Sequence, residues 1–120
     1  MGDFMNVGID MVKIDRFEKL KDNPTFLNKV FCENEVTYLE KRNFNLATMA
    51  GMFAAKEAFL KTLKKGLDSY PLNDIEISHN DDGAPFFMFH SNLAKYNDNI
   101  LLSISHDGDY AISLVVNNIV

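Results

Sequence analysis

The sequence has one cysteine, no tryptophan and only three prolines among its 120 residues. A single cysteine, Cys32, excludes an internal disulfide and fits a reducing compartment. No apolar run approaches the roughly 18 residues of a membrane-spanning helix, and the N-terminal residues lack the charged start and apolar core of a signal peptide. The sequence therefore predicts a soluble, cytoplasmic protein. A half-buried structural role explains Cys32, beside Phe31, better than a catalytic thiol does.

Positive charge is also scarce. Lysine and arginine number 12 against 17 acidic residues, which gives a formal net charge of −5. This balance argues against general affinity for nucleic acid, which needs a basic footprint. A phosphate-bearing ligand must therefore meet a local group of basic side chains or a bound cation. Hydrophobic residues make up 47% of the chain, enough for a real core, and the length predicts one domain over residues 1–120.

Hydrophobic periodicity and turn residues divide the chain into one strand, a run of helices and four further strands. Asn23-Pro24 predicts the start of one helix, Asn43 or Asn45 caps the longest one, and Gly66 ends it. The order predicts an α+β domain with helices on one face of an antiparallel sheet, whose centre is formed by the last two strands. The predicted helices cover residues 16–20, 25–31, 33–41, about 45–65 and 91–97, and the predicted strands cover residues 5–12, 75–79, 86–89, 100–106 and 110–116.

The first predicted strand carries an unusual acid. Val7, Ile9 and Met11 lie on one face of the strand and Asp10 lies on the other, so we expect one face to be buried. Aspartate is depleted in strands. Asp10 either faces solvent on an outer face or projects a carboxylate from the sheet, with Gly8 leaving room beside it for another chain or a ligand.

The longest predicted helix carries a carboxylate and an ammonium group among small and apolar residues. Glu57 and Lys61 are one turn apart and share a face with Phe53. One interpretation is an exposed ion pair, worth only a few tenths of a kcal/mol. The other is a charged pair held at the edge of a core, which would suit a metal-bound phosphate group.

Other chemical candidates in the sequence are weaker. Ser105 and His106 are neighbours on a predicted strand and point to opposite faces, so they cannot act together as nucleophile and base. No close spacing of cysteine and histidine favours zinc. Asp10 and Glu57 form a better pair for a hard cation such as Mg²⁺, because two oxygen ligands leave positions for water and phosphate.

Four motifs occur together and in a familiar order. They are residues 8–12 (GIDMV), residues 53–58 (FAAKEA) followed by Lys61, residues 82–85 (DGAP), and residues 103–106 (SISH). The chain resembles the bacterial holo-acyl-carrier-protein synthases, a family of small 4′-phosphopantetheinyl transferases, over essentially its whole length.

The resemblance implies a reaction and its catalytic residues. The 4′-phosphopantetheine group of coenzyme A passes to a serine of apo-acyl-carrier protein, for fatty acid biosynthesis, and adenosine 3′,5′-bisphosphate is released. Mg²⁺ is expected at Asp10 and Glu57. Glu57, directly or through a metal-bound water, is expected to take the serine proton, although water held by another acid could serve. Lys61 matches a lysine that contacts the phosphates.

The resemblance also implies where the two substrates are held. Gly83, Pro85 and His106 match positions that line the nucleotide part of the coenzyme A cleft. Arg16 matches an arginine that meets the acidic carrier protein. Similar proteins are homotrimers with active sites between neighbouring subunits, so we expect the same assembly here.

The chain departs from the family pattern at charged positions. Met52 stands where the family often has arginine, and Ala84 stands where it often has lysine. These two departures predict fewer charged contacts to coenzyme A, and the candidates to substitute for them are Lys41, Arg42, Lys64 and Lys65. Two other hypotheses stay open from the sequence: a non-catalytic α+β binding or assembly module, and another Mg²⁺-dependent phosphoryl-transfer enzyme.

Overall fold

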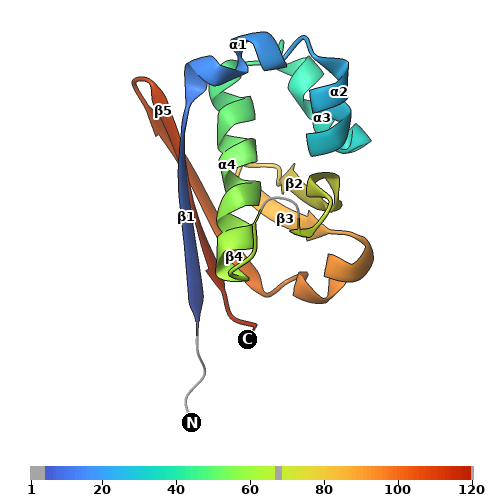
Figure 1. Ribbon diagram of the computed structural model, residues 1–120, viewed down its shortest axis with the longest axis vertical. Coiled ribbons are helices and arrows are strands. Elements are labelled where there is room, and N and C mark those ends of the chain that lie inside the picture. Colours follow the sequence, from blue (N-terminus) through green and yellow to red (C-terminus); the bar gives the residue numbers. More distant parts are fainter. Residues whose placement is uncertain (1–4, 67–68, 120) are drawn as a thin grey trace.

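A computed structural model describes residues 5–66 and 69–119 as an α+β domain (Figure 1). The predicted fold class is confirmed, and the order of strands and helices follows the prediction. The strands are β1 (Asn6–Lys13), β2 (Ile75–His79), β3 (Pro85–Phe89), β4 (Ile100–Asp107) and β5 (Tyr110–Asn117). The helices are α1 (Phe17–Leu20), α2 (Pro24–Val30), α3 (Glu33–Lys41) and α4 (Leu46–Thr62), with short 3-10 segments η1 (Ile14–Arg16), η3 (Leu72–Asp74) and η4 (Ser91–Tyr96).

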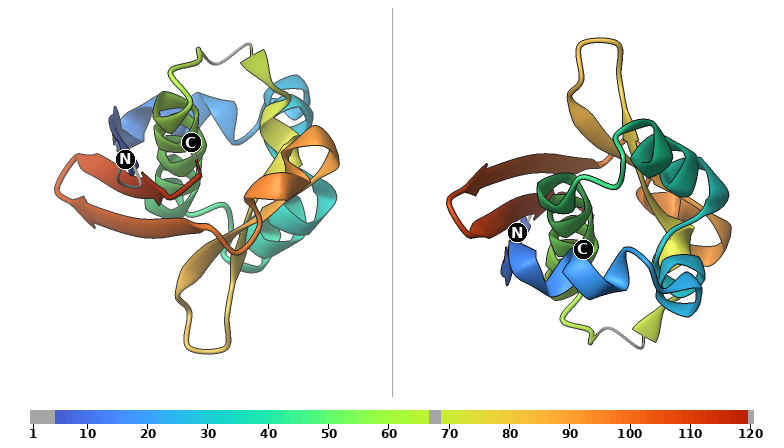
Figure 2. Two further views of the ribbon diagram at one scale, coloured as in Figure 1. Left: turned by 90° about the horizontal axis from the view of Figure 1, so that it is seen from below. Right: turned by 90° about the horizontal axis from the view of Figure 1, so that it is seen from above.

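The strands form two antiparallel sheets rather than one. Three of them pair in the order β1-β5-β4, and β2 pairs with β3. The expectation that both C-terminal strands are central holds only for β5, because β4 is an edge strand. Figure 2 shows α4 enclosed between the three-stranded sheet and a layer made by α2, α3, β2 and β3. The core lies on both sides of α4, which is buried along most of its length.

The buried face of β1 is the one that carries Asp10. Val7, Ile9 and Met11 are 60%, 52% and 61% exposed, whereas Asp10 packs toward α4 and is only 8% exposed. Gly8 explains this close packing, because a Cβ atom there would lie 1.8 Å from the carbonyl oxygen of Ala58. The strand therefore lies directly against the helix, and Asp10 is carried to the helix surface with it.

The outer face of the three-stranded sheet is apolar and exposed. Ile9 of β1 lies beside Leu114 of β5, and Val7 of β1 lies in register with Leu101 of β4 through β5. Leu101 is 64% exposed and Leu114 is 41% exposed. Across the described ranges, no helix is both long and apolar enough to cross a lipid bilayer.

The predicted N-terminal caps of α2 and α4 are confirmed, whereas the predicted C-terminal end of α4 is not. Asn23 and Asn45 accept hydrogen bonds from the backbone N–H groups of Phe26 and Thr48, at 3.1 and 3.0 Å. At the other end of α4, the predicted stop at Gly66 is wrong. The helix ends at Thr62, and Lys64 takes the left-handed conformation, with φ of 59°.

The local hydrogen bonds explain this earlier stop. Lys64 donates its backbone N–H to the carbonyl oxygen of Lys61, and Lys65 donates to that of Leu60, both at 3.1 Å. Together they form the two-bond Schellman ending. A lysine here takes the place that glycine usually fills.

Candidate active site at the meeting of β1 and α4

Asp10 packs against α4 with one carboxylate oxygen hydrogen-bonded and the other without a hydrogen-bond partner. Its Oδ1 accepts a hydrogen bond from Nζ of Lys61 at 3.0 Å. Its Oδ2 is buried and has no hydrogen-bond partner. A buried carboxylate oxygen without a partner is unfavourable in the absence of a ligand. The free oxygen therefore marks Asp10 as a group that can bind something else.

Glu57 lies beside Asp10 on the neighbouring face of α4. Burial, first, and the neighbouring Asp10 carboxyl, second, raise the pKa of Glu57 to about 7, against the opposing charges of Arg16 and Lys61. The two acids, 47 positions apart in sequence, therefore meet within one subunit. Two neighbouring carboxyl groups disfavour ionisation of both unless a cation lies close to them.

Lys61 supplies a positive charge at the same place. Its Nζ donates to the backbone oxygen of Ile9 at 2.9 Å as well as to Asp10, and its side chain is 54% exposed. Beside it lies a small cavity of about 160 Å³, lined by Glu57, Leu60, Lys61, Lys65 and Gly66. The ammonium group is thus fixed at one side and open to a ligand at the other.

The acids fit a hard divalent cation. Carboxylate oxygens are the ligands that Mg²⁺ prefers, and it usually keeps several waters and takes the rest of its ligands from phosphate. The free Oδ2 of Asp10 matches this requirement. Within the described ranges no group of three or more His, Cys, Asp or Glu side chains could hold a metal ion, so the protein offers the pair Asp10 and Glu57 and no complete cage.

Arg16 lies at the edge of the same region. Its guanidinium carbon is 5.9 Å from the ring centres of both Phe17 and Phe53, and its charge acts on Glu57. Phe53 also lines an adjoining, mainly apolar cavity of about 580 Å³, together with Phe26 and Lys29. A cation and an apolar hollow therefore lie side by side next to the acids.

The residues predicted to bind the nucleotide lie elsewhere in the subunit. Gly83 is at the tip of the β2–β3 hairpin with φ of 90°, Pro85 begins β3, and the hairpin projects from the body of the molecule (Figure 2). His106 is on β4, which β5 separates from β1. None of these three residues lines the cavity beside Glu57.

Three of the four basic residues considered as substitutes for the missing charges line one of two cavities. Lys65 lines the cavity beside Glu57. Lys41 and Arg42 line a separate cavity of about 450 Å³ with Gly83. Arg42 is held there by its stack on the ring of Tyr38, with 3.7 Å between the guanidinium carbon and the ring centre.

Comparisons with known proteins agree with this arrangement of motifs. Residues 6–115 match the family model of the 4′-phosphopantetheinyl transferase superfamily. The holo-[acyl-carrier-protein] synthase of Caldicellulosiruptor saccharolyticus is 37% identical over 116 residues, which cover 92% of this chain and 94% of the relative. The same enzyme of Oceanobacillus iheyensis is 40% identical over 114 residues, with 92% of each chain covered. The chain belongs to the holo-acyl-carrier-protein synthase family of 4′-phosphopantetheinyl transferases.

Solved structures of the family share the fold. The acyl-carrier-protein synthase of Chronobacterium ammoniagenes, in complex with coenzyme A, is 28% identical and superposes with a TM-score of 0.81 over 96% of this chain and 97% of that one. The Helicobacter pylori synthase, also in complex with coenzyme A, is 32% identical with a TM-score of 0.78, over 91% of this chain and 96% of that one. The chain is thus an enzyme of the transferase class, as the resemblance implied.

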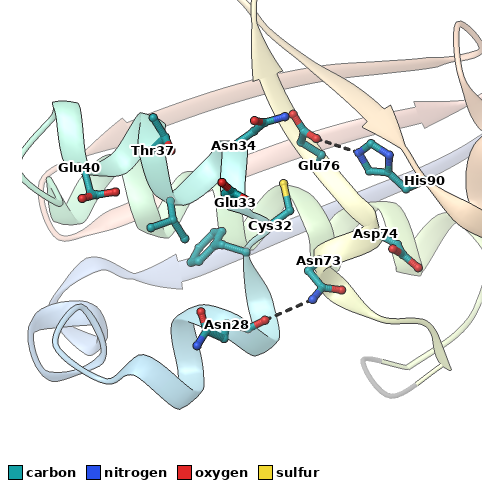
Figure 3. Close-up of a pocket in the computed structure, with 12 residues that line it drawn as sticks. Asn28, Cys32, Glu33, Asn34, Thr37, Glu40, Asn73, Asp74, Glu76 and His90 are labelled. Carbon is teal, nitrogen blue, oxygen red and sulfur yellow. Dashed lines mark hydrogen bonds and ion pairs between the residues drawn. The ribbon is translucent and has the colours of Figure 1, made fainter.

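A larger cavity of this transferase lies away from the acids. It has a volume of about 880 Å³ and is lined mostly by polar residues, chiefly from α3 and η3 (Figure 3). It shares no residue with the cavity beside Glu57. In it, Oε1 of Glu76 lies 2.8 Å from Nε2 of His90. Burial raises the pKa of the Cys32 thiol to about 11, so the thiol stays protonated and is a poor nucleophile. The structural role predicted for Cys32 fits this environment.

Sequence reasoning missed one pair of charged residues. Lys56 and Glu35 are fully buried and form an ion pair of 2.7 Å. Burial lowers the pKa of Lys56 and raises that of Glu35, and the attraction between the two opposes both shifts. A lysine in a helix that is apolar on nearly every side requires a buried partner. The sequence carries that signal, but it does not show which acid is the partner.

Proposed function

We propose that the chain transfers the 4′-phosphopantetheine group of coenzyme A to a serine of apo-acyl-carrier protein, with Mg²⁺, and releases adenosine 3′,5′-bisphosphate. The meeting of Asp10, Glu57 and Lys61 at the junction of β1 and α4 is the observation that carries the proposal. Relatives named as holo-acyl-carrier-protein synthases and family structures with bound coenzyme A support it. The product is proposed to serve fatty acid biosynthesis in the cytoplasm.

Asp10 and Glu57 would hold the Mg²⁺ ion. Both offer hard oxygen ligands, and Oδ2 of Asp10 has no other partner. When bound, the ion neutralises charge on the diphosphate and stabilises the leaving group.

The protein's own side chains supply the remaining chemistry. The serine oxygen attacks the phosphorus that carries pantetheine, and the bond from that phosphorus to the bisphosphate oxygen breaks. Glu57, directly or through a water held beside it, accepts the serine proton. Lys61, held by Ile9 and Asp10, directs its ammonium group at the phosphates and offsets their charge.

The carrier protein and neighbouring subunits are proposed to bind at two different surfaces. Arg16, beside an apolar hollow, suits an acidic carrier protein with an apolar contact residue, because docking needs a local cation and not a basic protein. The exposed apolar face of the three-stranded sheet suits packing of copies in a homotrimer. In that trimer, Gly83, Pro85 and His106 of a neighbour would complete the coenzyme A site.

One assay tests the proposal against the two other hypotheses. The protein is mixed with coenzyme A, Mg²⁺ and apo-acyl-carrier protein, and the carrier is weighed by mass spectrometry, with a chelator as control. We expect a mass gain of one phosphopantetheine group that the chelator abolishes. Binding of coenzyme A without transfer would favour another phosphoryl-transfer enzyme. The absence of both coenzyme A binding and phosphopantetheine transfer would favour a non-catalytic module.

A further inference from the structure

The buried pair of Lys56 and Glu35 has every polar atom in use. The three protons of the Lys56 ammonium go to Oε1 of Glu35 at 2.7 Å, to the carbonyl oxygen of Val30 at 2.8 Å and to that of Leu72 at 2.9 Å. A lysine ammonium has only three donors, so its capacity is filled. Oε2 of Glu35 accepts the backbone N–H of Ile77 at 3.0 Å.

These bonds join α4 to the whole layer on its far side. Val30 ends α2, Glu35 lies in the first turn of α3, Leu72 begins η3 and Ile77 lies in β2. A buried ion pair is often no more stabilising than apolar side chains of the same volume. Its specific contribution is therefore geometric, because one lysine bonds α4 to three other elements directly and to a fourth, β2, through Glu35.

The Lys56–Glu35 pair lies next to Glu57, because Lys56 precedes Glu57 on α4. Lys56 and Glu57 are consecutive, so their side chains leave α4 about 100° apart. Lys56 reaches α2, α3 and η3, whereas Glu57 lies near Asp10 on β1. On the β1 side, Gly8 already lies against the carbonyl of Ala58. The helix is thus held on two sides, with Glu57 between the two contacts.

Rotation of α4 would move both charged groups together. A side-chain tip about 6 Å from the helix axis moves by about 1 Å for a rotation of about 10°. A misplacement of about 1 Å in a catalytic group can reduce turnover by on the order of a hundredfold. A small loss of control over the helix angle is therefore enough to separate Glu57 from Asp10.

We infer that Lys56 is a positioning residue, which fixes the rotation of α4 through Glu35, Val30 and Leu72 and so holds the Glu57 carboxyl group against Asp10. The inference rests on the proposed function, because it assigns Lys56 a part in placing the two acids that would hold the metal. Lys56 itself touches no substrate.

Three variants and one control test the inference. Lys56→Met removes the ammonium, Glu35→Gln/Lys56→Met removes both charges so that no buried charge is left unpaired, and Glu35→Gln keeps an acceptor for Lys56. Leu93→Ala serves as the control, because Leu93 is a buried core residue of η4 outside the site and its truncation lowers stability by a different route. Each protein is studied well below its melting temperature, with sucrose present.

Two measurements distinguish an effect on the position of Glu57 from an effect on the stability of the protein. Mn²⁺ affinity is measured by electron paramagnetic resonance without substrates, and kcat and KM for coenzyme A are measured per folded molecule. We expect both Lys56 variants to lose about tenfold or more in Mn²⁺ affinity and kcat, with a smaller change in KM. Glu35→Gln leaves the buried Lys56 charge without its carboxylate, so it should lose stability, but it keeps the Val30 and Leu72 acceptors and should lose less Mn²⁺ affinity than the Lys56 variants. Leu93→Ala should keep wild-type Mn²⁺ affinity.

Three results would overturn the inference. One is a folded double variant with wild-type Mn²⁺ affinity and kcat. Another is an equal loss in Leu93→Ala, which would attribute the effect to general destabilisation. The third is failure of both Lys56 variants to fold even at low temperature, which would assign Lys56 a purely stabilising role. A wild-type protein that neither binds Mn²⁺ nor transfers phosphopantetheine would instead refute the proposed function, so the two failures are distinguishable.

Discussion

Replacing Gly8 with alanine should separate β1 from α4 and disable the site without touching either acid. The new Cβ atom would lie 1.8 Å from the carbonyl oxygen of Ala58 and 2.8 Å from its carbon. Ordinary contacts between such atoms lie at about 3.5 Å or more, so the strand must move by more than about 1 Å. Backbone atoms cannot turn aside as a flexible side chain can. Asp10, two residues along the same strand, moves with it.

The expected magnitudes follow from this displacement. Overpacking of a core costs about 1–3 kcal/mol, which for a chain of this size lowers the melting temperature by on the order of 10 °C. A shift of about 1 Å between Asp10 and Glu57 should lower kcat by on the order of a hundredfold in protein that is still folded.

Thermal unfolding followed by circular dichroism, and transfer activity measured well below the melting temperature, check the two effects separately. Gly66→Ala is the matched control for stability, because a Cβ atom at Gly66 meets nothing within 4 Å. We expect its melting temperature to stay near that of the wild type. A Gly8→Ala protein with wild-type melting temperature and turnover would refute the reasoning about strand and helix.

Four further predictions concern the charged groups of the site and the cysteine. Lys61→Ala should raise KM for coenzyme A and lower kcat in steady-state assays, because the ammonium at 3.0 Å from Asp10 is lost; unchanged constants would remove Lys61 from the site. Because the pKa of Glu57 is raised to about 7, a metal competes with a proton there, so Mn²⁺ affinity should rise about tenfold per pH unit below 7 and level off above it, as followed by calorimetry. The same raised pKa of Glu57 makes the metal-free protein more stable below pH 4.5, and this contribution is lost as pH rises through about 7. The melting temperature of metal-free protein should therefore fall over this range, and a melting temperature that does not fall would argue against the raised pKa. Because the half-buried Cys32 thiol has a pKa of about 11, the wild type should be alkylated slowly near neutral pH, and Cys32→Ser should retain transfer activity. Loss of turnover in a folded Cys32→Ser protein would show that the thiol takes part.

Local signals in the sequence were enough to predict most of the secondary structure. Asn23 followed by Pro24, and Asn45 before an alanine-rich stretch, are helix starts that depend only on nearby residues, and both act as predicted. The end of α4 was predicted wrongly because Gly66 is the obvious left-handed residue. The structure uses Lys64 instead, and its hydrogen bonds to the preceding turn make up for the unfavourable conformation.

Signals that depend on distant parts of the chain were harder to use. The alternation in β1 predicts two unlike faces, but it does not show which one meets α4. The face with Val7, Ile9 and Met11 looks like a core, yet it is exposed in the subunit. Close approach of the Ala58 carbonyl to Gly8 selects the other face, and this contact is invisible in the sequence.

Some residues of the candidate site could be predicted from the sequence, and others depend on contacts with distant parts of the chain. Asp10 and Glu57 were paired from the sequence on their ligand chemistry and on the resemblance to the family, and the structure places them near each other. The roles of Gly83, Pro85 and His106 stay predictions, because none of the three lines the cavity beside Glu57. Glu35 was not singled out, because its partner is 21 positions away on a different helix.

The central claim is that one acid from β1 and one from α4 hold a single divalent cation. Titration of Mn²⁺ into the metal-free protein, followed by electron paramagnetic resonance, tests it most directly when repeated with folded Asp10→Ala and Glu57→Ala variants. The account predicts one site per chain in the wild type and loss of that site in each variant. Binding of wild-type strength in either variant would contradict it.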